Sequence, residues 1–140
     1  MSPDDIPLLF RHSTRRLPRR ELAEFLQRIA RGRNVTCLIT DDRELRRLNR
    51  RFRGANHATD VLSFPDEGGG EIAISLDRAA EQAAQHGHSL ADEIRILMLH
   101  GVLHLAGMDH ENDSGAMERA EIRWRKRLKL PTGLIERAKR

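Results

Sequence analysis

Three histidines that lie close together in the sequence, His100, His104 and His110, are the residues whose type and spacing indicate chemistry most directly. Residues four apart lie on one face of a helix, so the imidazoles of His100 and His104 can both reach one ion. Gly107 follows, and glycine readily adopts the left-handed backbone that ends a helix, which would bring His110 back as a third ligand. A single histidine on such a helix is more often a core residue, but the triple spacing predicts a metal site.

The chemistry of this site follows from its ligands. Three neutral imidazoles leave the charge of a divalent ion intact and one coordination position open, as in catalytic rather than structural zinc sites. The ion would lower the pKa of bound water to about 7 and polarise a carbonyl or phosphoryl oxygen. We expect one zinc ion, although nickel or another divalent ion can bind the same imidazoles. Asp109, between two of the ligands, would either orient a histidine or cap the turn.

Gly101 separates this pattern from a well-known protease motif. The spacing equals that of the metzincin proteases, H-E-x-x-H-x-x-G-x-x-H, but Gly101 stands where those enzymes have their glutamate general base. A glycine inside a helix costs about 1 kcal/mol relative to alanine, so its bare backbone should serve either a substrate beside the metal or close helix packing. Spacing alone therefore leaves a zinc metalloprotease-like hydrolase as an alternative, although its carboxylate is absent.

The whole histidine segment, H-G-V-L-H-L-A-G-M-D-H, resembles the H-G-x-L-H-L-x-G-x-D-H motif of the YbeY endoribonucleases, a family of bacterial rRNA-maturation factors. Upstream segments also match the family: L-N at 48–49, F-R-G at 52–54, T-D-V-L-S-F-P at 59–65 and G-E-I-A-I-S at 70–75. The family usually has aspartate where this chain has Glu71. Thr59, Asp60 and Ser63 are expected to fix the strand beside the site rather than to do chemistry.

The resemblance implies a zinc-dependent, single-strand-specific endoribonuclease that acts in 16S rRNA 3′-end maturation and ribosome quality control. Single-stranded RNA or rRNA and the small ribosomal subunit would be its partners, and no DNA is expected. The resemblance places the metal ligands at His100, His104 and His110 and a catalytic arginine at Arg53. Without the resemblance, Arg53 would be interpreted as a cation that stabilises the C-terminus of a helix. As the catalytic residue that the resemblance implies, it would bind a phosphate and stabilise charge developing at phosphorus.

Two questions stay open at this point. A ribosome-assembly factor with a mainly structural zinc ion is an alternative from outside the enzymes. The attacking group is equally undecided, because metal-bound water and the 2′-hydroxyl of the RNA both fit the pattern.

The distribution of charge agrees with an anionic partner. The net charge of +4 conceals 14 basic and 7 acidic residues in 1–53, 3 basic and 13 acidic in 54–122, and 8 basic and 1 acidic in 123–140. Of the 25 basic residues all but three are arginines, and the guanidinium group matches phosphate oxygens two at a time. The alternative is that these arginines lie on solvent-exposed helix faces and bind no anionic partner. Four Phe, one Trp and no Tyr count against a sheet that stacks bases on aromatic rings.

The elements that must position these residues form one α/β (α+β) domain over residues 1–140, with a small mixed sheet, about five helices and the metal site on the central helix and the turn after it. Residues 1–5 and 133–140 are expected to be loose ends. Strands are expected at 6–10, 35–40, 61–64 and 71–76, with Pro65 and the glycine run at 68–70 between the last two. Helices are expected at 18–31, from Asp41–Asp42 to about Phe52 with Leu45, Leu48 and Phe52 inward, and at 77–85, 90–106 and 113–128.

Several function classes are excluded by the remaining residues. The longest apolar stretch, 96–108, is too short to span a bilayer, and the first residues lack the pattern of a signal peptide, so we expect a cytoplasmic protein with no membrane partner. Cys37 is expected to be a buried strand thiol. Trp124 is assigned to the core rather than to base stacking. The other histidines, which lack the metal spacing, are assigned to the surface: His12, His57, His86 and His88.

Overall fold

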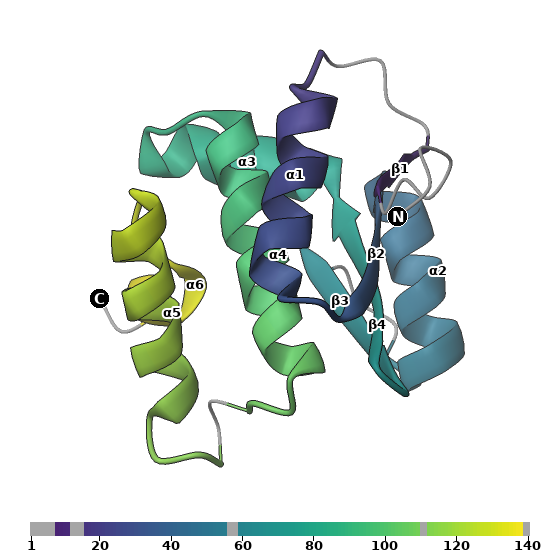
Figure 1. The fold of residues 1–140 in the computed structure, drawn as a ribbon. Coiled ribbons are helices and arrows are strands. Elements are labelled where there is room, and N and C mark those ends of the chain that lie inside the picture. Colours follow the sequence, from purple (N-terminus) through teal and green to yellow (C-terminus); the bar gives the residue numbers. More distant parts are fainter. Residues whose placement is uncertain (1–7, 12–15, 56–58, 110–111, 139–140) are drawn as a thin grey trace.

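The computed structural model describes residues 8–11, 16–55, 59–109 and 112–138 (Figure 1). The strands are β1 (Leu8–Phe10), β2 (Asn34–Thr40), β3 (Val61–Asp66) and β4 (Gly69–Ser75). The helices are α1 (Arg19–Ala30), α2 (Asp42–Arg53), α3 (Leu76–His86), α4 (Leu90–Leu105), α5 (Ala116–Leu128) and α6 (Leu134–Ala138). The predicted α+β class with a mixed sheet is confirmed, and the described part of the chain has six helices where about five were expected.

The four strands form one sheet in the order β1-β2-β4-β3. Strands β1, β2 and β4 are parallel, and β3 runs antiparallel to β4 as the second arm of a hairpin. The predicted hairpin is confirmed, but both strands extend further toward its turn than expected, because Pro65 pairs with Gly70 inside the ladder. Proline is tolerated there because β3 is the edge strand. A side chain on Gly69 would collide with the backbone of Asn34, so this glycine permits close approach of β2 as well as the turn.

Helix α4 lies at the centre of the molecule, as its nearly uniform apolar character predicts. The Ser89 side chain caps it by accepting the Asp92 N–H. In Figure 1, α4 packs between α1 and α5 and against one face of the sheet. Gly101 makes that packing possible, because a side chain there would come within 2.9 Å of the buried Ile72 on β4. Of the two uses expected for this glycine, close packing is the one that the structure supports.

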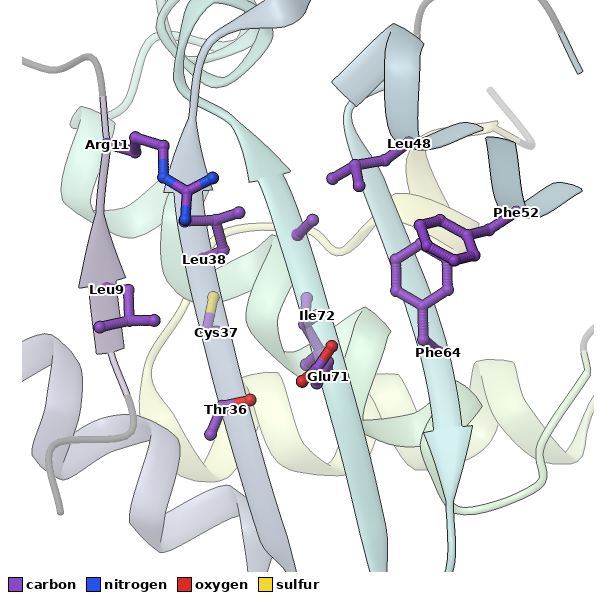
Figure 2. Close-up of a pocket in the computed structure, with 11 residues that line it drawn as sticks. Leu9, Arg11, Thr36, Cys37, Leu38, Leu48, Phe52, Phe64, Glu71 and Ile72 are labelled. Atoms are coloured by element: carbon purple, nitrogen blue, oxygen red, sulfur yellow. The ribbon is translucent and has the colours of Figure 1, made fainter. Parts of the chain in front are cut away.

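The other face of the sheet is covered only in part, by α2. Asp41 caps α2 and Leu45 is buried as predicted, but Phe52 is 58% exposed and so is not the inward residue that was expected. Since α2 covers the β3–β4 half of this face, a groove of about 340 Å³ stays open over β1 and β2 (Figure 2). Phe52 and Phe64 meet edge to face at one wall of this groove, 5.6 Å apart.

Residues 134–138 form α6 and are not the loose end that was expected. Ile135 is buried, and the Glu136 carboxylate accepts hydrogen bonds from Nε and one Nη of Arg125 on α5, at 2.6 and 2.8 Å. Arg137 binds Glu93, a fully buried carboxylate of α4, through two further hydrogen bonds. These contacts hold the last helix against α4 and α5. The predicted loose residues 1–5, and 139–140, lie outside the described residues.

His88 belongs to the same buried network, so its assignment to the surface is wrong. Its Nε2 lies 2.6 Å from a carboxylate oxygen of Glu93, and only 10% of its side chain is exposed. Burial alone would raise the pKa of Glu93, but the hydrogen bonds from Arg137 and His88 outweigh it and hold this pKa below its ordinary value. His86 is exposed as expected, while His12 and His57 lie outside the described residues.

Cys37 and the start of α5 were also predicted from the sequence. Cys37 is fully buried on β2, and burial raises the pKa of its thiol. Helix α5 begins at Ala116 rather than at Asp113, because the Asp113 side chain accepts the N–H groups of Gly115 and Met117 before the helix starts. Among the described residues, no helix is both long enough and apolar enough to cross a membrane.

Candidate metal centre

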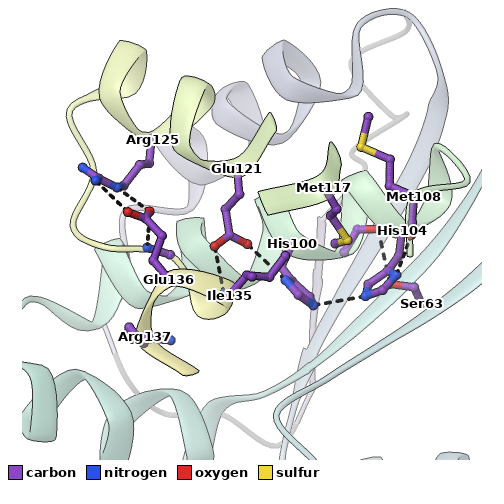
Figure 3. Close-up of polar contacts among 12 residues, drawn as sticks. Ser63, His100, His104, Met108, Met117, Glu121, Arg125, Ile135, Glu136 and Arg137 are labelled. Atoms are coloured by element: carbon purple, nitrogen blue, oxygen red, sulfur yellow. Dashed lines mark hydrogen bonds and ion pairs between the residues drawn. The ribbon is translucent and has the colours of Figure 1, made fainter. Parts of the chain in front are cut away.

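His100 and His104 project from the same face of α4 and point their Nε2 atoms at each other, 3.1 Å apart (Figure 3). The second nitrogen of each ring is held by an oxygen. His100 Nδ1 lies 3.2 Å from Oε2 of Glu121, and His104 Nδ1 lies 3.0 Å from the Met108 carbonyl oxygen. The two rings are close to perpendicular, at 77°. The i, i+4 spacing has therefore produced the convergent pair that the sequence predicted.

The oxygen partners decide the tautomer of both rings. A carbonyl and an ionised carboxylate only accept hydrogen bonds, so each Nδ1 must carry the proton and donate it. A neutral imidazole protonated at Nδ1 has a lone pair at Nε2, so two lone pairs face each other across 3.1 Å. Two facing lone pairs repel unless a cation, a metal ion or a proton, lies between them. Histidine ligands in metal sites are oriented in this same way, by an oxygen on the opposite ring nitrogen.

The dimensions of the pair fit a metal ion. Two nitrogens at about 2.0–2.1 Å from a tetrahedral zinc ion lie about 3.3 Å apart, close to the 3.1 Å found here. Two imidazoles alone do not complete a site, and within the described residues no third His, Cys, Asp or Glu joins them. His110, the predicted third ligand, lies outside the described residues. The turn that leads to it begins as predicted, with Gly107 at φ +89°.

Glu121 is a residue of the candidate site that the sequence analysis missed. Its side chain comes from α5 and is only 1% exposed. One carboxylate oxygen faces His100 and the other accepts the backbone N–H of Ile135 at 2.9 Å (Figure 3). A signal was present in the sequence, because Glu121 is four residues after Met117 and three before Trp124, which places a carboxylate on the inward stripe of an amphipathic helix.

The segment that leads into α6 is shaped around this carboxylate. A side chain on Gly133 would collide with the Glu121 carboxylate, so only glycine leaves it in place. Leu134, the next residue, lines the cleft that contains the histidines. The last helix therefore contributes to the metal centre through the Ile135 N–H group and the wall that Leu134 supplies.

Arg53 reaches the same cleft from the opposite face of the sheet. It is the last residue of α2, where Gly54 ends the helix with a left-handed backbone. Its guanidinium donates to the Ser63 carbonyl and lies 5.6 Å from the centre of the Phe64 ring. The Ser63 hydroxyl donates to the Gly101 carbonyl at 3.3 Å, which links the edge strand β3 to α4. This path brings an arginine and the histidine pair together around the sheet edge.

The cleft has a volume of about 340 Å³, and it brings together three of the four predicted site residues, Arg53, His100 and His104. Its polar wall is built by the β3 edge and the residues that precede it. Thr59 donates to the Val61 carbonyl at 3.5 Å, and Asp60 accepts a hydrogen bond from Gln82 on α3. Thr59, Asp60 and Ser63 thus hold the strand in place, as expected.

Two further residues of the histidine segment have structural roles. Asp109 accepts a hydrogen bond from the Asn112 side chain at 2.7 Å, and its carbonyl accepts the Asn112 N–H. These two bonds close the turn, which is one of the two roles expected for Asp109. Gly101, which stands at the position of the protease general base, faces the sheet, and the space beside it is occupied by the Ile72 side chain. The cleft therefore has an open imidazole pair beside a cation and lacks the carboxylate of the metzincin motif.

Comparisons with known proteins agree with the resemblance. A sequence model described as Endoribonuclease YbeY matches residues 11–129. A relative of that name from Solibacter usitatus is 53% identical over 97% of both chains. Another, from Koribacter versatilis, is 60% identical over 74% of this chain and 70% of its own. A solution structure from Thermotoga maritima aligns with a TM-score of 0.59 at 26% identity and covers 84% of this chain and 85% of its own.

Proposed function

The chain belongs to the YbeY family of endoribonucleases, and from this premise we propose how its own residues act on RNA. The chain is a metal-dependent hydrolase that cleaves RNA phosphodiester bonds. We propose that the metal is one zinc ion and that His100, His104 and His110 hold it. The observation that carries this proposal is the pair of Nε2 lone pairs facing each other across 3.1 Å.

Neighbouring oxygen atoms orient the imidazole rings of His100 and His104. Glu121 and the Met108 carbonyl hold the two Nδ1 atoms, so that the Nε2 atom of each ring is oriented toward the position that an ion would take. Imidazole nitrogens suit zinc, and a site with three of them keeps a position for substrate. When bound, the ion supplies positive charge that polarises a phosphoryl oxygen. The opening of the histidine pair into a cleft favours this role over a closed structural site.

Arg53 is proposed to bind the scissile phosphate. The Ser63 carbonyl fixes the guanidinium at the cleft, and its other N–H groups can donate to the non-bridging phosphate oxygens. Charge that develops on these oxygens in the transition state is then stabilised by donors that are already in place. Phe64 beside the guanidinium limits its movement and favours its charge.

The substrate is proposed to be single-stranded rRNA, with the 3′ end of 16S rRNA on the small ribosomal subunit as its target and the cytoplasm as its location. The support is the motif resemblance together with arginine-rich segments on both sides of the acidic centre of the sequence.

Histidine substitutions test the proposed ligand set. We expect His104→Ala and His110→Ala to lose bound metal and RNA cleavage together, because each removes one imidazole. His86→Ala is the matched control, since His86 is exposed and lies on α3, away from the cleft. Metal content by mass spectrometry and cleavage of a single-stranded RNA are measured on the same samples. Full cleavage by a metal-free His104→Ala protein would contradict the proposal.

A further inference from the structure

Another cavity, of about 440 Å³ and separate from the groove and the cleft, lies between the C-terminal end of α1, the second half of α4 and α5, which are neighbours in Figure 1. Three of the residues around it are arginines, Arg31, Arg33 and Arg123, and no carboxylate is among the described residues that line it. We call it the arginine pocket. Its remaining lining is apolar: Ile29, Ala30, Val102, Leu103, Ala106, Met108, Ala120 and Trp124.

The arginine pocket joins two regions that are far apart in the sequence. Arg31 and Arg33 belong to the basic segment 1–53, and Arg123 begins the basic segment 123–140. Helices α1 and α5 both pack on α4, so folding brings the two basic segments together on one side of the molecule. The fold thus places arginines from both basic segments around one cavity.

The charges of the arginine pocket are not neutralised by the described part of the protein. All three arginines are exposed, and within the described residues none forms an ion pair with a carboxylate. Arg47 and Arg125, by contrast, bind Glu44 and Glu136. Three like charges placed close together repel one another, and an anion that enters between them removes this repulsion.

The apolar part of the pocket suits a nucleobase. Trp124 lies in its lining, with the guanidinium of Arg127 5.6 Å from the centre of the indole ring. Aromatic side chains stack on unpaired bases, and arginines beside them bind the phosphates. The volume is that of a pocket for a small ligand, so it admits a nucleotide of a single strand and excludes a duplex.

The arginine pocket is connected to the metal centre through Met108. This residue lines the pocket, and its carbonyl oxygen holds the His104 ring at 3.0 Å. His104 and Leu103 are adjacent on α4, where one faces the cleft and the other the pocket. The two places are therefore separated by the C-terminal end of α4, whose residues contribute to both.

We propose that the arginine pocket binds a second stretch of the same single-stranded RNA whose scissile phosphate lies in the cleft. Its arginines pair with backbone phosphates, and Trp124 packs against a base. The inference rests on the proposed function, because it takes the RNA of that reaction as the ligand. Trp124 packs against the core, as expected from the sequence, and it also lines the pocket. Its proposed contact with a base goes beyond the sequence expectation, in which the few aromatic residues counted against base stacking.

The test compares a short RNA that fills only the cleft with a longer one that reaches both places. The full-length, zinc-loaded protein is titrated with single-stranded RNAs of about 4 and about 16 nucleotides, the range that single-strand sites span. Fluorescence anisotropy is read before cleavage proceeds. The pocket variant carries Arg31→Gln, Arg33→Gln and Arg123→Gln. The control variant makes the same change at three exposed arginines of α2: Arg43, Arg46 and Arg50.

We expect the pocket variant to bind the longer RNA about tenfold more weakly and the short RNA with unchanged affinity. The dependence of its binding constant on salt should fall by a slope of about 2, since each lost phosphate contact contributes about 0.7. The α2 control should change the affinity for the longer RNA much less. An equal loss for both RNAs, an equal loss in the control variant, or no loss would overturn the inference.

Failure of the inference and failure of the proposed function are distinguishable in this design. Cleavage of the short RNA by the unmodified protein depends on the metal centre and not on the arginine pocket. If the unmodified protein cleaves both RNAs and the pocket variant binds them with unchanged affinity, only the inference is wrong. If the unmodified protein cleaves neither RNA, the proposed function is wrong, and the anisotropy titrations still decide whether the pocket binds RNA.

Discussion

Replacement of Glu121 by glutamine leaves only one acceptor oxygen for the two hydrogen bonds that the carboxylate accepts. One oxygen faces His100 Nδ1 at 3.2 Å and the other accepts the Ile135 N–H at 2.9 Å, so both partners are donors. Glutamine has nearly the same size but offers one acceptor oxygen and one NH₂ donor. In the 1% exposed position of Glu121 there is little water to replace the lost acceptor.

Each orientation of the new amide has a cost. If its oxygen accepts the Ile135 N–H, its NH₂ faces His100, which favours the ring tautomer with the proton on Nε2 and so removes the metal ligand. If its oxygen faces His100 instead, the amide NH₂ opposes the Ile135 N–H, and a buried donor without an acceptor costs about 1–3 kcal/mol of stability. The residues that orient metal ligands typically contribute 10- to 100-fold in metal affinity. We therefore expect Glu121→Gln to bind zinc about 10- to 100-fold more weakly, which is about 1.4–2.8 kcal/mol.

Competition with a chromophoric zinc chelator at constant pH measures this affinity directly. Glu136→Gln is the control, because it removes one carboxylate from the same junction of α5 and α6, where that carboxylate binds Arg125 and the Gly133 N–H. The control should lose some thermal stability and keep its zinc affinity. A folded Glu121→Gln protein with unchanged zinc affinity would refute the tautomer reasoning.

Three further outcomes follow from the structure. Arg53→Ala should lower kcat for RNA cleavage about 100-fold with metal content unchanged, and a parallel loss of metal would show a structural role instead. Gly101→Ala should lower the free energy of unfolding by about 1 kcal/mol, because crowding against Ile72 exceeds the gain in helix propensity; urea denaturation that shows a gain in stability would contradict this. Glu93→Gln should lose about 3 kcal/mol at pH 7, since Arg137 keeps a buried charge without its partner. The pKa of Glu93 is lower in the folded than in the unfolded protein, so its ionised carboxylate adds to the free energy of unfolding. This added stability is fully present above about pH 4.3 and is lost as pH falls through the folded-state pKa. The difference in unfolding free energy between the unmodified protein and Glu93→Gln should thus shrink in acid, and a constant difference from pH 7 to pH 3 would contradict the assignment.

The parts of the site that depend on local sequence could be predicted. His100 and His104 share one helix, so their spacing alone determines that their side chains meet. The cap at Ser89 and the positive φ of Gly107 are equally local, because they follow from the residue types at the ends of one helix. The convergent imidazole pair could therefore be predicted from one short helical segment before any tertiary contact was known.

The parts that depend on packing between distant elements could not be predicted. Glu121 faces His100 from another helix, 21 residues further along the chain. Its position also requires α6, which is too short to show a periodic pattern and is held by the buried Glu93 network. Phe52 completes an apolar helix stripe in the sequence, yet in the structure it stands at the wall of the open groove and is 58% exposed. In each case tertiary interactions determine where the side chain lies, and the local sequence does not indicate them.

The most direct test of the metal centre is a chelator titration in which bound zinc and RNA cleavage are measured in the same samples. We expect the protein to hold one zinc ion per chain, to lose cleavage in proportion to the ion removed and to recover it when zinc is returned. Undiminished cleavage by protein that holds no metal would contradict the account.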